Sequence, residues 1–236
     1  MDKLNKIKQL LSSFASAKDA EFLQGYFKTD KGGYGAGDVF IGVRVPQTRK
    51  VAREFCDTTL SVILKLLKSK IHEHRLLAVI MLVERFKWVD ETQQQAIYEA
   101  YLAHTRYINN WDIVDVSAPK IIGAWLFTRN RRVLTQLAKS SSLWERRIAV
   151  MATLYFINKN QFDDTLKLAT ILLHDNEDLI HKAVGWMLRE IGKRDRCAEE
   201  LFLKLHYRDM PRTMLRYAIE KFPDVLRKKY LEGRVS

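Results

Sequence analysis

The stretch LLAVIMLVERF, residues 76–86, decides the fold, because similar stretches recur further along the chain. They are RIAVMATLYF at 147–156, KAVGWMLREI at 182–191 and LRYAIEKF at 215–222. Each has apolar residues at helical spacing and an alanine at a matching place. The alanines are 40, 31, 34 and 35 residues apart at Ala78, Ala118, Ala149, Ala183 and Ala218. A small residue at one place in each repeat lets neighbouring helices approach closely, so the recurrence predicts stacked two-helix repeats.

Helical periodicity extends over most of the chain. It covers 58–69, 71–86, 90–104, 110–127, 130–139, 142–158, 160–174, 177–193, 195–207 and 211–222. The apolar groups at 10–14 and 22–27 predict two earlier helices, and Pro46 suits the first turn of a helix that runs through Phe55. We therefore predict an all-α fold: one domain over 1–236, an α-solenoid of stacked HEAT-like helical pairs with a concave, basic DNA-binding face. The alternative is an ordinary globular helical bundle whose alanines match by coincidence.

One irregular stretch, KGGYGAGDVFIGVRV at 31–45, holds five of the ten glycines. We expect a Gly-rich loop here, extended for a few residues from Phe40 but without partners for a sheet. Its glycines match neither a phosphate-binding loop nor a dinucleotide fingerprint, and no strand–turn–helix context surrounds them. A nucleotide-binding enzyme is therefore disfavoured.

Composition excludes several other classes. Ten glycines and four prolines are few for a β-sandwich or barrel, and no run approaches the roughly 20 apolar residues of a membrane span. The two cysteines, Cys56 and Cys197, lie far apart, and the six histidines contain no His-Glu-x-x-His. The N-terminus does not resemble a secretory signal. We expect a cytoplasmic monomer, nucleoid-associated when on DNA, with no metal, cofactor or membrane partner.

The charge points to a polyanionic partner. The chain has 40 Lys and Arg against 28 Asp and Glu, a net charge of +12. Basic groups recur along the chain at Arg49/Arg53, Arg129/Arg131/Arg132, Arg146/Arg147, Arg189/Lys193/Arg196 and Arg212/Arg216. One group per repeat predicts a basic stripe that fits a duplex backbone. The alternative for any one group is a solvated face or an ion-paired helix end.

The most unusual segment is NNWDIVDVSAPKIIGAWL at 109–126. Trp111 and Asp115 are separated by four residues and share one helical face, whereas Asp112 is turned away from Trp111. A tryptophan ring and a carboxylate on one face can stabilise a cation. The alternative places Trp111 in the core and makes Asp115 a helix cap.

Pro119 is expected to interrupt the helix in this segment. Asn109 or Asn110 can cap its start, and Ser117 can cap a restart before the proline. Asp115 would then lie beside helix N-terminal N–H groups, which hold a carboxylate ionised and fixed in direction.

Five stretches together resemble the AlkD family of DNA alkylation-repair glycosylases, which are compact HEAT-like solenoids. They are QGYFKTD at 24–30, DVFIGVRVPQTRK at 38–50, NNWDIVDVSAP at 109–119, LWERRIAVM at 143–151 and HKAVGWMLREIGKRD at 181–195. No single stretch is decisive, but their order and spacing are specific, and the resemblance covers nearly the whole chain. Asn110 stands where some members carry a second aromatic residue.

The resemblance implies roles for individual residues. It implies that Asp115 is the catalytic carboxylate, that Trp111 and Trp186 flank the deoxyribose of the lesion, and that Arg147 holds a backbone phosphate. Tyr26 is implied as a further DNA contact, and we expect Arg146, Lys182 and Arg189 to bind DNA as well.

These expectations combine into one function. We expect a monofunctional DNA glycosylase of base excision repair that releases positively charged bases, 3-methyladenine and 7-methylguanine, from duplex DNA. A charged base leaves as a neutral molecule, so no strong general acid is required. One alternative is a non-catalytic HEAT-repeat protein that binds DNA structures; another is a protein-binding scaffold.

Overall fold

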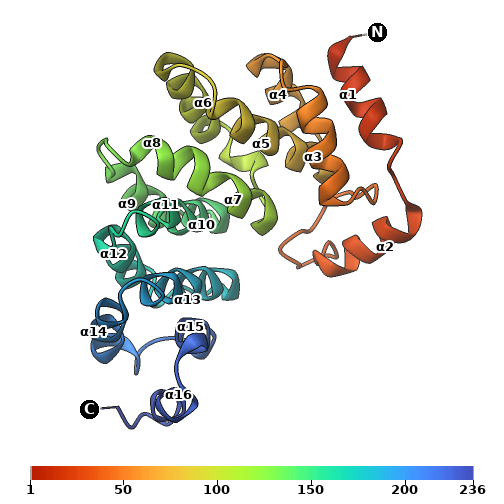
Figure 1. Cartoon of the computed structure of the whole chain (residues 1–236). Helices are drawn as coiled ribbons and strands as arrows, with labels where there is room; N and C mark the ends of the chain where they lie inside the picture. The colour runs from red at the N-terminus through yellow and green to blue at the C-terminus, as the bar shows by residue number, and fades with distance from the viewer. Residues whose placement is uncertain (1, 236) are drawn as a thin grey trace. The chain divides into compact units, whose positions relative to one another are not determined.

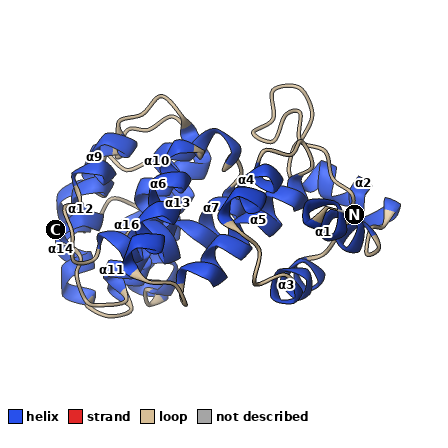
Figure 2. Cartoon of the chain, turned by 90° about the horizontal axis from the view of Figure 1, so that it is seen from above, coloured by secondary structure: helices blue, strands red, loops and turns tan. Residues whose placement is uncertain are grey.

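The structure, a computed structural model, describes residues 2–235 and is built from helices (Figures 1 and 2). Among those residues there is no strand, and the only bridge is an isolated parallel one between Val39 and Ile71. The all-α prediction is confirmed. The chain divides into two compact units, unit 1 (Met1–Ser117) and unit 2 (Ala118–Ser236). The prediction of a single domain stays a prediction.

Unit 1 is organised around one buried helix, α5 (His72–Phe86). The others are α1 (Lys3–Ser12), α2 (Ala17–Tyr26), α3 (Val45–Glu54), α4 (Leu60–Leu67), α6 (Glu91–Ala103), the 3₁₀ turn η1 (Thr105–Tyr107) and α7 (Trp111–Ala118). Helices α3, α4 and α6 all pack against α5. Because α5 is apolar nearly all round, it is stable only when neighbours cover it on every side.

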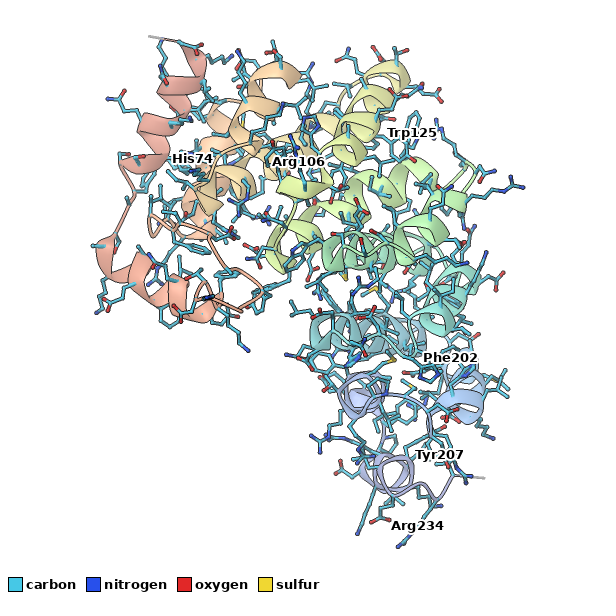
Figure 3. All side chains as sticks on the ribbon, turned by 180° about the vertical axis from the view of Figure 1, so that it is seen from behind. His74, Arg106, Trp125, Phe202, Tyr207 and Arg234 are labelled. Atoms are coloured by element: carbon cyan, nitrogen blue, oxygen red, sulfur yellow. The ribbon has the colours of Figure 1, made fainter. Side chains whose placement is uncertain are left out.

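Unit 2 begins with a π-helical segment, η2 (Pro119–Gly123). It continues with α8 (Ala124–Leu126), α9 (Arg132–Ala138), α10 (Leu143–Ala152), α11 (Leu154–Ile157), α12 (Asp163–Ile171), α13 (Asp178–Gly192), α14 (Arg196–His206), α15 (Arg212–Ala218), η3 (Ile219–Lys221) and α16 (Asp224–Leu231). Helix α16 was not predicted from the sequence, since it buries only Tyr230. Figure 3 shows Phe202 and Tyr207, both buried, within this unit.

Small residues bring successive helices of unit 2 together, as the repeats predicted. Ala149, Ala183 and Ala218 are fully buried on α10, α13 and α15. Helices α13 and α15 approach at a glycine: a Cβ on Gly185 would lie 2.4 Å from the carbonyl oxygen of Met214. Helices α13 and α15 can therefore pack this closely only because residue 185 lacks a side chain.

The α-helix is interrupted at Pro119, as predicted, but by a π-helical turn that continues the helical path, so only the predicted restart capped by Ser117 is wrong. Ala118 has helical angles (φ −57°, ψ −44°), and α7 leads directly into η2. The π turn accommodates a proline, whose missing N–H and ring would disrupt an α-helical turn. Ser117 caps no restart, because its hydroxyl donates to the Ile113 carbonyl at 2.6 Å. A helix N-terminus therefore does not orient Asp115.

No helix in the described part of the chain is long and apolar enough to cross a membrane.

Candidate active site

The Gly-rich loop is clamped to the start of α5 by a buried carboxylate. Glu73 accepts hydrogen bonds from the backbone N–H groups of Ile41, Gly42 and Val43 at 2.8–3.2 Å. Gly42 has φ 79°, and a Cβ there would lie 2.0 Å from the Ser16 carbonyl oxygen. The Glu73 bonds fix the chain that follows Asp38 against α5, and the close approach at Gly42 fixes it against the start of α2.

Asp38 is the centre of a buried polar network that joins the loop, α5 and the start of α7. It accepts from Arg75 Nη2 at 2.7 Å, from His72 Nδ1 at 3.2 Å and from Asn110 Nδ2 at 3.3 Å. His72 Nε2 bonds Asp112 Oδ2 on its other side at 2.8 Å. Together these contacts couple the two carboxylates through one imidazole ring.

Neighbouring charges and hydrogen bonds outweigh burial in setting the pKa values of His72 and Asp38. Burial alone lowers the pKa of His72, but the charge and hydrogen bond of Asp112 and the bond to Asp38 raise it above its ordinary value. Burial acts to raise the pKa of Asp38, yet the bond from His72 and the charge of Arg75 hold it below its ordinary value. An imidazolium between two carboxylates is the arrangement that these shifts favour.

The network places Trp111 at the first position of α7. The Trp111 backbone N–H donates to Asn110 Oδ1 at 2.8 Å, and its indole Nε1 donates to the Tyr34 hydroxyl at 3.3 Å. Its ring stacks on Phe27 (centroids 5.3 Å apart) and meets Tyr26 edge-on at 6.1 Å. Trp111 is half-buried, so part of its ring stays accessible while contacts on several sides hold its orientation.

Asp115 lies one turn after Trp111 in α7 and is also half-buried. Burial raises the pKa of the Tyr101 hydroxyl, its hydrogen bond with Ser117 lowers it, and the negative charge of Asp115 adds to the rise. Asp112 is committed instead to His72. The two carboxylates of α7 therefore have different surroundings, as their positions on the helix predicted.

Five predicted residues lie in unit 2. Arg147, at the start of α10, is only 4% exposed and donates to the Leu179 carbonyl at 2.5 Å. Arg146 pairs with Asp175 at 2.6 Å and 3.2 Å and donates to the carbonyls of Ser140 and Ser141. Both guanidinium groups thus have partners within the protein, and Arg147 is the more deeply buried of the two residues.

The other three share one face of α13. Lys182 pairs with Asp178 at 2.7 Å, and Arg189 pairs with Glu220. Trp186 is half-exposed and donates from Nε1 to Glu190 at 3.1 Å. Trp186 is therefore partly buried and is not a fully buried core tryptophan.

Sequence reasoning missed Asp38, Tyr34, His72 and Arg75. The available signal was HEHR at 72–75, a polar run at the start of an otherwise apolar helix. Polar side chains at buried helical positions require partners, and these partners come from a loop more than 30 residues away. Within the described residues, no group of three or more His, Cys, Asp or Glu side chains could hold a metal ion.

We expect His72 to make stability depend on pH. Because the pKa of His72 is raised on folding, its contribution is complete below the unfolded value of about 6.5 and is lost as pH rises through the folded value. The melting temperature of the wild type should exceed that of His72→Gln most at acidic pH. The difference should shrink as pH rises. Groups shared by both proteins cancel in this comparison, and a difference that grows with pH would contradict a charged His72.

Comparisons with known proteins identify a family and a fold. A family described as DNA alkylation repair enzyme matches residues 7–222. A solved structure titled a predicted DNA alkylation repair enzyme from Enterococcus faecalis is similar to 89% of this chain and 97% of its own, with TM-score 0.71 and 17% identity. The crystal structure of smu.31 from Streptococcus mutans UA159 covers 94% of this chain and 100% of its own, with TM-score 0.53 and 18% identity. These likenesses show the fold. No curated protein matches the sequence.

Proposed function

The chain belongs to the DNA alkylation repair enzyme family, and we propose that it is a monofunctional DNA glycosylase. Its substrates are positively charged alkylated bases, such as 3-methyladenine and 7-methylguanine, in duplex DNA. The reaction hydrolyses the N-glycosidic bond and leaves an abasic site for base excision repair.

One observation carries the proposal: Trp111 and Asp115 lie one turn apart on α7, both half-buried, and Trp111 is held by several contacts. Side chains four residues apart on a helix are neighbours, so a ring face and a carboxylate flank the same space. Both groups stabilise positive charge, and neither needs a metal or a covalent intermediate to do so.

The chemistry of cationic lesions matches this pair. An alkylated base with a positive charge leaves as a neutral molecule, and its departure puts positive charge on the sugar. Asp115 stabilises that charge and can orient the water that attacks the sugar carbon, as carboxylates do in glycosidases. Trp111 offers its negative π face to the same cation. In this proposal Trp186 supplies a second ring to the sugar.

Substrate preference tests the proposal directly. Duplexes that carry 7-methylguanine, uracil or hypoxanthine are incubated with the protein and scored for free base and abasic sites. We expect release of 7-methylguanine and retention of uracil and hypoxanthine, because a neutral base gains nothing from a site that only stabilises cations. Efficient uracil release would contradict the proposal, because it requires a general acid and none has been assigned to this site. No release of any base would favour a non-catalytic DNA-binding protein.

DNA affinity should be electrostatic and insensitive to sequence. The net charge of +12 predicts an affinity that falls steeply as the salt concentration rises. The logarithm of the binding constant should fall linearly with the logarithm of the salt concentration, with a slope of about −0.9 per neutralised phosphate. Arg147→Ala should weaken binding to damaged and undamaged duplex alike. Arg146→Ala is the comparison variant: its salt bridge to Asp175 is lost, so its melting temperature should fall. Affinity that does not change with salt would contradict binding through phosphates.

A further inference from the structure

Helix α2 carries two exposed aromatic rings, Phe22 and Tyr26, and of these only Tyr26 contacts the site described above. Phe22 is 67% exposed and Tyr26 is 55% exposed, although a folded protein normally covers rings of this size. Their centroids lie 6.0 Å apart and their planes differ by 17°. The pair therefore offers a planar ligand two nearly parallel π faces.

The same helix face carries a glycine whose side-chain space is empty. Gly25 lies in the last turn of α2, one residue before Tyr26 and three after Phe22. A Cβ built there would meet nothing within 4 Å, and no positive φ requires glycine at this position. A glycine inside a helix lowers its stability relative to alanine, so packing within the protein does not explain this residue. It leaves open space beside the two rings.

The surroundings favour a polyanion that carries flat rings. Lys18 lies one turn before Phe22 on the same face and is exposed. Lys28 is exposed as well, and its Nζ lies 6.0 Å from the centroid of the Tyr34 ring. Of the two carboxylates on this helix, Asp19 is paired with Arg44 at 2.7 Å and Glu21 is exposed. Cations beside stacking rings are the combination that binds nucleic acid strands through backbone and bases together.

The rings are also continuous with the candidate active site. Tyr26 meets the edge of Trp111 at 6.1 Å, so aromatic surface runs from Trp111 through Tyr26 to Phe22. We infer that Phe22, Gly25 and Tyr26 form a stacking subsite for an unpaired nucleobase of the bound DNA. The inference rests on the proposed function, since it takes DNA as the ligand. Phe22 and Gly25 enlarge the site beyond the residues that act on the sugar.

The test compares two duplexes of one sequence, one fully paired and one with a single unpaired base, by fluorescence anisotropy with the full chain. The wild type should bind the bulged duplex about tenfold more tightly, as expected from one base stacked on aromatic rings. Phe22→Ala should bind the two duplexes with about equal affinity. Its affinity for the bulged duplex should fall, and its affinity for the paired duplex should stay unchanged. Phe22→Trp should retain the preference.

A steric variant and a matched control complete the experiment. Gly25→Leu leaves both rings in place, fills the open space and suits a helix, so it should also abolish the preference without lowering the melting temperature. Leu205→Ala removes a 76%-exposed apolar side chain on α14 and should change neither affinity. The subsite is overturned if the wild type shows no preference, or if Phe22→Ala or Gly25→Leu keeps it.

Release of 7-methylguanine by the wild type separates this inference from the proposed function. If the protein releases the base but binds both duplexes equally, only the stacking subsite is contradicted. A protein that prefers the bulged duplex but releases no base keeps the subsite and loses the glycosylase proposal.

Discussion

Asp115→Asn is expected to slow release of 7-methylguanine by some hundreds-fold while folding and DNA affinity stay almost unchanged. The substitution keeps the size of the side chain and removes only its charge. A fixed carboxylate in a partly dry site contributes about 3–4 kcal/mol to a transition state that gains positive charge, which corresponds to that loss in rate. The measurement is single-turnover base release, with the melting temperature as the control for folding.

Asp112→Asn is the matched control, since both carboxylates lie on α7 three residues apart. Asp112 bonds the buried His72 ring at 2.8 Å, so its loss should lower the melting temperature. At a temperature where the variant is folded, base release should change only mildly. An inactive Asp112→Asn protein together with an active Asp115→Asn protein would show that the wrong carboxylate has been assigned. If both variants kept full activity, the glycosylase proposal itself would fail.

Trp111→Ala and Trp186→Ala should lose less activity than Asp115→Asn, because a ring face stabilises a cation less than a full negative charge does. Their loss should lie in the rate of excision, since both side chains are proposed to act on the sugar as positive charge develops. Single-turnover rates at saturating enzyme separate this loss from weaker DNA binding.

Asp38→Ala is expected to destabilise unit 1 by about 3–5 kcal/mol, the cost of removing one partner from a buried ion pair. The side chain of Asp38 is 6% exposed, and its removal leaves the buried cations of His72 and Arg75 without this carboxylate. The bond from Asn110 is lost as well, which loosens the start of α7. Denaturant unfolding measures the loss.

Asp19→Ala is the control for this prediction. Asp19 also pairs with an arginine, but the Arg44 side chain is 70% exposed, so solvent screens the pair and its loss should change stability little. Equal losses for Asp38→Ala and Asp19→Ala would contradict the view that the Asp38 network is a buried structural element.

The sequence by itself determined the helical fold and the face shared by Trp111 and Asp115. Both depend on local spacing: apolar residues at helical intervals predict helices, and residues four apart on a helix are neighbours. For the same reason, the predicted helix at 71–86 matches the bounds of α5 to within one residue. The different directions of Asp112 and Asp115 also follow from helix geometry alone.

Only the tertiary structure decided what holds these residues in place. Asn110 meets Asp38 from 72 positions away, and Trp111 meets Tyr34 from 77 positions away, and no local pattern encodes such pairings. The π turn at Pro119 and the salt bridge from Arg146 to Asp175 likewise depend on local relaxation and packing that periodicity does not describe. Spacing specifies which side of a helix a residue occupies, whereas long-range contacts decide whether that side is buried, paired or open to DNA.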